Sequence, residues 1–128
     1  MNPWTKDELP KVAGAEELEI ASFRPDGTLR KPVTIWVIRD GEGLYVRSVK
    51  GPTALWFRGT QDKHKGRIRA GGVEKDVTFV DAEHNINDDV DAAYRAKYRR
   101  YAGSTLNSVL TAQARSTTIK LLPRSTRS

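Results

Sequence analysis

The sequence contains no cysteine, and this absence excludes several kinds of chemistry. Without thiols the chain has no disulfide framework, no thiolate nucleophile and no cysteine-ligated zinc. Its two histidines, His64 and His84, have no carboxylate at metal-ligand spacing, so we expect no metal site. Stability must therefore come from packing, and any redox activity requires a bound cofactor.

Long hydrophobic runs are also absent. No apolar stretch approaches the roughly 18 residues that a membrane-spanning helix needs. The N-terminal residues lack the basic and apolar regions of a signal peptide, so we expect a soluble, cytoplasmic protein without membrane contact. A chain of 128 residues, of which 38% are apolar, can bury one core but is too short for two ordinary domains. We interpret 1–128 as a single domain, with a helical segment over 1–17 and a tail over 123–128.

Acidic residues are missing from the last part of the chain. Asp91 is the last of them, and eight Lys and Arg residues follow it. Such a basic end can attract nucleic acid or an acidic partner. The charges are nevertheless spread over a predicted helix, a strand and the tail, and they form no compact basic block. We therefore favour a solvated basic surface and do not expect nucleic-acid binding.

Several catalytic signatures are missing as well. The sequence has no Gly-x-Ser-x-Gly elbow, no Walker loop and no Rossmann glycine pattern. The usual motifs of hydrolases and of enzymes that act on nucleoside triphosphates are therefore absent. Asp88, Asp89 and Asp91 stand at the start of a predicted helix, where the helix dipole accounts for them. The Gly and Glu positions of a calcium-binding EF-hand loop are absent around them.

What the sequence does contain is a succession of strand patterns separated by turns. Strands rich in β-branched and aromatic residues are predicted over 18–23, 32–39, 44–49, 66–70, 73–80 and 116–122. A short helix is predicted from Thr5, which stands three residues before Glu8 at the spacing of a capping box, and it is limited by Pro10. The other predicted helices are one or two turns over 51–58, a long one over 88–101 and a short one over 105–114. Hairpins with a late strand that returns to the sheet predict a mainly β, closed or nearly closed antiparallel barrel with peripheral helices.

The stretch from Tyr45 to Arg58 contains the side chains best suited to bind a ligand. Arg47, Ser48, Lys50 and Arg58 surround a predicted strand-to-helix turn, where cationic side chains and backbone N–H groups can bind a phosphate. Two tryptophans, at 36 and 56, could supply flat apolar walls. The alternative is that both tryptophans are ordinary core residues and that the cations are merely exposed.

A set of motifs extends over nearly the whole chain: Arg24–Pro32, Ile35–Val37, Leu44–Ser48, Gly51, Trp56, Gly66, Gly71-Gly72, Asp76-Val77, Ala93-Tyr94, Lys97-Tyr98, Ala114 and Pro123. This set resembles a bacterial family catalogued as domain of unknown function 2255. At a greater distance the layout is similar to that of deazaflavin-dependent nitroreductases and pyridoxamine-phosphate-oxidase-like proteins. The resemblance implies an FMN-binding split β-barrel-like fold that forms a homodimer around FMN or a deazaflavin.

Carried over to this sequence, the resemblance implies nine cofactor-binding residues: Arg30, Pro32, Trp36, Arg47, Ser48, Lys50, Gly51, Trp56 and Arg58. Two departures from the wider group stand out. Arg58-Gly-Thr replaces a frequent Asn-Leu pair, and Arg47 stands where deazaflavin enzymes often have a small residue. That arginine could strengthen a phosphate contact or fill the space of the cofactor.

Three functions remain open from the sequence. The first is a flavin- or deazaflavin-dependent oxidoreductase, in which the cofactor supplies the hydride chemistry. The second is a non-catalytic protein on the same barrel that binds a small-molecule ligand and needs no cofactor. The third is a binder of nucleic acid or an acidic partner that uses Tyr94, Tyr98 and Tyr101 for stacking. These tyrosines fall on the apolar face of their helix, where core or dimer contacts are the better expectation.

Overall fold

The computed structural model describes residues 4–124, so most of the tail predicted over 123–128 lies outside the described residues. The strands are β1 (Leu18–Ser22), β2 (Val33–Ile35), β3 (Ile38–Asp40), β4 (Gly43–Val46), β5 (Lys65–Ala70), β6 (Val73–Asp81) and β7 (Ile119–Pro123). The α-helices are α1 (Glu8–Ala13), α2 (Leu55–Lys63), α3 (Asn87–Lys97), α4 (Ser104–Asn107) and α5 (Ala112–Arg115). Three 3₁₀ turns, η1 (Gly51–Thr53), η2 (His84–Ile86) and η3 (Arg99–Tyr101), complete the described elements.

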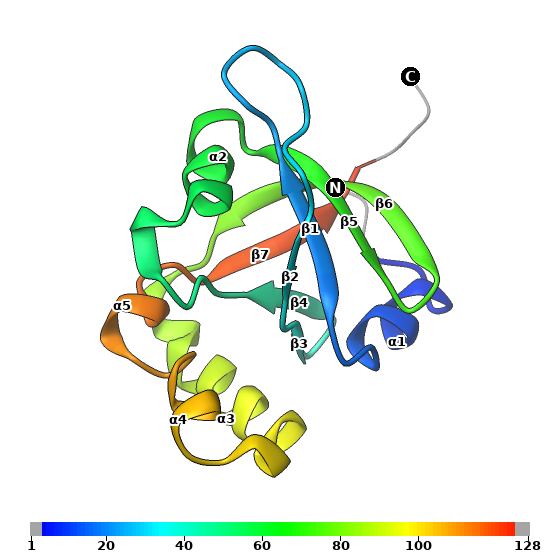
Figure 1. Ribbon diagram of the computed structural model, residues 1–128. Coiled ribbons are helices and arrows are strands. Elements are labelled where there is room, and N and C mark those ends of the chain that lie inside the picture. Colours follow the sequence, from blue (N-terminus) through cyan, green and yellow to red (C-terminus); the bar gives the residue numbers. More distant parts are fainter. Residues whose placement is uncertain (1–3, 125–128) are drawn as a thin grey trace.

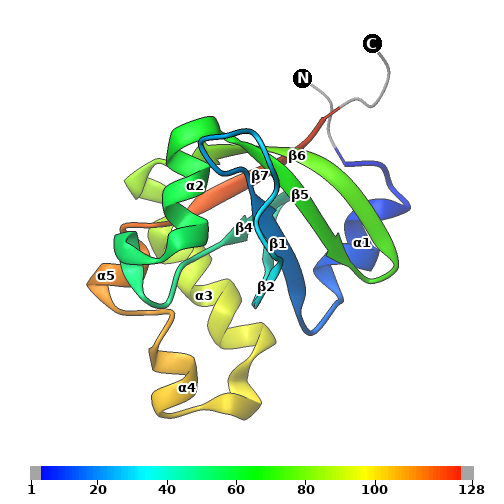
Figure 2. The ribbon, with the colours of Figure 1, turned by 45° about the horizontal axis from the view of Figure 1, so that its top comes forward.

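The strands form one antiparallel sheet in the order β2-β1-β5-β6-β7-β4-β3. Its two edge strands, β2 and β3, follow one another in the sequence with only Trp36 and Val37 between them. The sheet must therefore curl until its edges approach each other, and Figure 2 shows this curl clearly. The predicted mainly β split barrel with peripheral helices is confirmed.

Two groups of buried residues hold the barrel and its helices together. The barrel interior contains the inward-facing residues of the strands, such as Ile20, Ile68 and Leu121. A second group joins α3 to the outside of the sheet through Tyr45, Tyr94 and other apolar side chains. Helices α1 and α2 lie on opposite sides of the barrel, and α3 and α4 pack below it in Figure 1.

The strand predicted over 32–39 is two strands rather than one. The backbone of Val37 is bound by side chains of the α3 region, which removes it from the sheet. Tyr98 Oη accepts a hydrogen bond from the Val37 N–H at 3.3 Å, and Lys97 Nζ donates to the Val37 carbonyl at 2.7 Å. Because of this break, the segment 33–40 forms both edge strands of the sheet, β2 and β3.

The helices also differ from the prediction at their ends. The capping box is confirmed, because the Glu8 N–H donates to Thr5 Oγ1 at 2.9 Å and the Thr5 N–H donates to Glu8 Oε1 at 3.2 Å. Pro10 does not end α1, which continues beyond it to Ala13. The helix predicted over 51–58 is divided at Ala54 into the 3₁₀ turn η1 and the helix α2, which extends to Lys63. The helix predicted over 105–114 is two short helices.

Within residues 4–124 no helix is both long and apolar enough to cross a lipid bilayer. The same part of the chain holds no group of three or more His, Cys, Asp or Glu side chains arranged to bind a metal ion.

Candidate functional site

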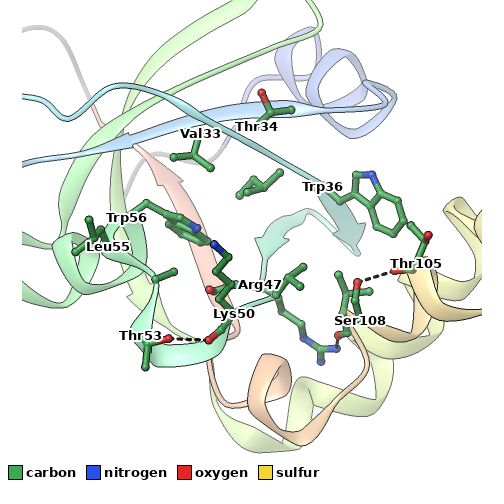
Figure 3. Close-up of a pocket in the computed structure, with 15 residues that line it drawn as sticks. Val33, Thr34, Trp36, Arg47, Lys50, Thr53, Leu55, Trp56, Thr105 and Ser108 are labelled. Carbon is green, nitrogen blue, oxygen red and sulfur yellow. Dashed lines mark hydrogen bonds between the residues drawn. The ribbon is translucent and has the colours of Figure 1, made fainter.

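A pocket of about 680 Å³ opens beside the edge strand β2. Its walls come from three regions that are far apart in the sequence: 33–36, the turn region with 47–50 and 53–56, and Thr105, Ser108 and Val109. Figure 3 shows β2 on one side of the pocket, the turn before α2 on another and α4 at the far end. The volume lies within the range of roughly 300–1,000 Å³ that is typical of small-ligand sites.

The pocket is apolar, with few polar groups. Its apolar walls include Val33, Ile35, Trp56 and Val109, and none of the fifteen lining residues is acidic. Hydroxyl groups come from Thr34, Ser48, Thr53, Thr105 and Ser108. Lys50 is exposed, and no carboxylate of the described residues forms an ion pair with it. Such a lining suits an apolar or aromatic molecule that is neutral or negatively charged.

The predicted strand-to-helix turn is held by its own polar groups. Ser48 Oγ donates to the Gly51 carbonyl at 2.8 Å, and the Ser48 N–H donates to Thr117 Oγ1 at 2.8 Å. Gly51 has a φ of +71°, and a Cβ there would lie 2.1 Å from the Gln113 side chain. Ser48 and Gly51 therefore shape the pocket by fixing the turn, and the proton of the Ser48 hydroxyl is already engaged by the protein.

Arg47 belongs to the lining, but its guanidinium points away from the pocket (Figure 3). The side chain is completely buried, and Nη1 donates to Asp91 Oδ1 at 2.5 Å and to the Val109 carbonyl at 2.9 Å. Nε donates to Thr118 Oγ1 at 2.9 Å, and Nη2 donates to both oxygens of Asn87 at 3.1 and 3.2 Å. Arg47 therefore neither lies at a phosphate contact in the pocket nor fills the space of a cofactor, the two alternatives considered from the sequence. Its guanidinium instead joins β4, α3 and the start of β7, and the pocket remains open.

The other predicted residues divide between two hollows. Trp36, Lys50 and Trp56 line the pocket together with Arg47 and Ser48. Arg30 and Pro32 instead line a smaller hollow of about 270 Å³ on the outer face of β1 and β5. Arg58 is exposed on α2 and lines neither hollow. The predicted cluster of Arg47, Lys50 and Arg58 around one phosphate is not formed among the described residues, because Arg58 lies outside the pocket and the Arg47 guanidinium is bound within the protein, which leaves Lys50 as the cation of this group that faces the pocket.

Sequence reasoning missed the wall formed by Thr105, Ser108 and Val109. The Ser108 hydroxyl donates to the Thr105 carbonyl at 2.6 Å, and the Val109 carbonyl accepts from Arg47. This segment was predicted as a helix without a functional role. No local pattern marks it, because long-range contacts bring it to the pocket: the hydrogen bond from Arg47 and the packing of Leu106 and Val109 against the α3 region.

The sequence was compared with models of known protein families. Residues 8–121 match the model of DUF2255, described as an uncharacterized protein conserved in bacteria. The chain belongs to this family. Among curated proteins, no sequence matches it.

Solved structures show the same fold in proteins with very different sequences. A pyridoxamine 5′-phosphate oxidase-like protein from Listeria innocua is 13% identical, with a TM-score of 0.63 over 91% of this chain and 90% of that protein. An F420 reductase is 17% identical, with a TM-score of 0.53 over 94% of this chain and 97% of that protein. An FAD-binding protein from Mesorhizobium loti is 13% identical, with a TM-score of 0.56 over 97% of this chain and 93% of that protein. At these identities the likeness establishes the split-barrel fold of the DUF2255 chain and nothing finer.

Proposed function

We propose that this DUF2255 protein binds a flavin-type cofactor, FMN or a deazaflavin, in the pocket beside β2 and acts as an oxidoreductase. The observation that carries the proposal is that the pocket brings Trp36, Lys50 and Trp56 together around one apolar space without any acidic side chain. The fold is shared with an FAD-binding protein and an F420 reductase, which supports the same class of ligand.

The residues present fit such a ring. A flat heteroaromatic ring needs apolar walls, and Val33, Trp56 and Val109 provide them. Lys50 is the cation available to the negatively charged end of the cofactor. When bound, a flavin or deazaflavin supplies hydride transfer, whereas the protein binds and orients the ring and limits the access of water. This assignment agrees with a pocket whose described lining contains no carboxylate and no imidazole.

The proposal is tested by the visible absorption spectrum of freshly purified protein and by titration with FMN and with a deazaflavin. Lys50→Ala should weaken the affinity for either cofactor about tenfold, because it removes one charge-assisted contact. Lys31→Ala removes the same charge from an exposed position that lines neither hollow, and it should leave the affinity unchanged. Colourless protein that binds neither cofactor would refute the proposal.

The second candidate is a protein that binds a small ligand without catalysis. One observation favours it: the Arg47 guanidinium is fully engaged by the protein, so of the two cationic residues among the described pocket lining, Lys50 is the one left to contact a cofactor phosphate. This candidate would be supported if a bound flavin could not be reduced by any reductant. Tight binding of an uncharged apolar ligand in place of a flavin would also support it. The structure disfavours the nucleic-acid hypothesis, because two of its three stacking tyrosines, Tyr94 and Tyr98, are buried and cannot stack on a base.

We also propose that two copies of the chain associate across the mouth of the pocket. Four large hydrophobic side chains are exposed in the described part of the chain, and three of them, Val33, Val49 and Leu55, line this pocket. Exposed apolar residues gathered at one site commonly mark an interface or a ligand groove. A second copy would cover this rim and narrow the opening.

A further inference from the structure

Trp36 connects the pocket to a cluster of tyrosines. Its side chain is half-buried and lies at the end of the pocket near α4 (Figure 3). One face of the indole stacks on Tyr98, with ring centroids 4.0 Å apart and planes 5° from parallel. The Tyr101 ring lies 5.3 Å from the indole at an angle of 40°. Aromatic rings in van der Waals contact can exchange an electron. Whether a tyrosine gives up an electron to the indole then depends on the groups that contact its hydroxyl.

The two tyrosines differ in what their hydroxyl groups contact. The Tyr98 hydroxyl lies 2.7 Å from the Glu16 carbonyl and 3.1 Å from the Val37 carbonyl, and burial raises its pKa. The Tyr101 hydroxyl donates instead to the side-chain carboxylate of Glu16. Hydrogen bonds from Tyr101 and Arg100 lower the pKa of that carboxylate, so Glu16 is ionised at neutral pH.

This difference matters because a phenol is oxidised readily only when its proton can leave with the electron. A backbone carbonyl accepts a hydrogen bond but is too weak a base to take the phenolic proton, whereas an ionised carboxylate can accept that proton when the phenol is oxidised and becomes strongly acidic. Tyr98 can therefore share the charge of an oxidised Trp36 through stacking, but its own oxidation is opposed. Tyr101 has a base in place and lies at the half-exposed end of the cluster.

We propose that Trp36, Tyr101 and Glu16 form a one-electron relay from the pocket to the protein surface. Trp36 would give one electron to a one-electron oxidant in the pocket, such as a photoexcited flavin-type ring, which would be reduced by that electron. Tyr101 returns an electron to Trp36, and the phenolic proton moves to the Glu16 carboxylate. A soluble reductant such as ascorbate then supplies an electron to the tyrosyl radical, and Glu16 gives the proton back.

The relay protects the pocket by moving oxidising equivalents away from the bound ligand. It relies on the proposed flavin-type occupant only for its natural oxidant. The relay residues can therefore be tested without any cofactor, and a failure to bind flavin would be seen separately in the titrations described above.

The test is pulse radiolysis of the full chain with azide radical, which oxidises tryptophan to its radical. In the wild type, the tryptophanyl absorption should be replaced by tyrosyl absorption in a first-order phase whose rate is independent of protein concentration. Tyr101→Phe and Trp36→Phe should each abolish this phase. Glu16→Gln should slow it about tenfold or more, because a carboxamide does not accept the proton.

Two matched variants serve as controls. Tyr98→Phe removes the other tyrosine near the same indole and should retain the phase, and Glu17→Gln changes the adjacent exposed glutamate and should have no effect. Circular dichroism checks that each variant is folded. The relay is refuted if Tyr101→Phe keeps the phase, or if Tyr98→Phe alone removes it, since the acceptor of the electron would then be a different residue.

Discussion

Arg47 is a charged residue in a place where most proteins bury apolar side chains. Its guanidinium is fully buried, and it lies among Asp91, Asn87, Val109 and Thr118, with each nitrogen bound by at least one oxygen. A buried charge is tolerated only when it is paired and hydrogen-bonded in this way. The residue therefore stabilises the attachment of α3 to the barrel, and the pocket depends on it indirectly through the position of Val109.

The first prediction is that Arg47→Ala destabilises the protein. Removing the guanidinium leaves the Asp91 carboxylate and the Val109 carbonyl without this partner in a buried place, which typically costs about 3–5 kcal/mol. The free energy of unfolding in urea measures this loss. The control is Arg69→Ala, which breaks an exposed ion pair with Glu19 and should cost about 1 kcal/mol or less. Unchanged stability with loss of a bound phosphorylated ligand would instead make Arg47 a ligand-binding residue.

Lys97 is the second residue with an unusual electrostatic position. Burial lowers the pKa of Lys97 to about 8. The Nζ atom donates to the carbonyls of Ala15 at 2.6 Å and Val37 at 2.7 Å. A neutral amine still has two N–H groups, so both bonds persist when the proton is lost. The folded state therefore tolerates the neutral form well, whereas the unfolded chain holds the proton up to the ordinary lysine pKa of 10.5.

The second prediction follows from this difference. Between pH 8 and about pH 10 the unfolded chain binds more protons than the folded protein at this site, so the free energy of unfolding should rise with pH. The upper limit is set by the tyrosines of the unfolded chain, which ionise near pH 10. Urea unfolding at a series of pH values measures the rise. Lys97→Met should flatten it, whereas Lys31→Met should not, and an equal slope in all three proteins would show that Lys97 keeps its ordinary pKa.

At the scale of elements, the pocket depends on how α2 is attached to β1. The Ser22 hydroxyl donates to the Trp56 carbonyl at 2.8 Å, and Gly59 allows the helix to approach this strand closely. A Cβ at position 59 would lie 2.2 Å from Ser22 Oγ and 3.1 Å from the Phe23 carbonyl oxygen. Trp56 and Leu55, which line the pocket, are carried by the same helix.

The third prediction concerns Gly59→Ala. In an exposed helix this change stabilises by about 1 kcal/mol through helix propensity. Here the contact with Ser22 should outweigh that gain, and we expect a net loss of about 1–2 kcal/mol. Thermal unfolding measures the sign, and Arg58→Ala, at the adjacent exposed position, provides the control. A more stable Gly59→Ala protein would mean that α2 can move away from β1 without cost.

At the scale of the whole molecule, the exposed hydrophobic residues are unevenly distributed. Val33, Val49 and Leu55 surround the pocket, and Leu55 has 63% of its surface exposed. Val80, on β6, has 39% exposed but does not line the pocket. This distribution leaves one face of the molecule with an apolar rim.

The fourth prediction is a homodimer that buries this rim. Light scattering over a wide concentration range should give twice the mass of the chain. Leu55→Glu should shift the protein to monomer, because it places a charge in the apolar interface, whereas Val80→Glu introduces the same charge elsewhere and should leave the dimer intact. A wild-type protein that remains monomeric would exclude the dimer.

The local sequence determined most of the elements and their order. The capping box at Thr5, the Gly71-Gly72 hairpin and the aromatic spacing of α3 are short-range patterns, and each appears where it was predicted. Such features depend on backbone preference and on the alternation of apolar residues, which the sequence displays directly. The family motifs, which extend over nearly the whole chain, determined the barrel.

Only the tertiary structure decided what the charged and aromatic residues do. Arg47 was predicted beside a phosphate, but its partners, Asp91, Val109 and Thr118, come from segments forty or more residues away. The break of the edge strand at Val37 depends likewise on Lys97 and Tyr98. A sequence shows which groups can form bonds, but a guanidinium or a carbonyl bonds to whatever the folded chain brings within about 3 Å.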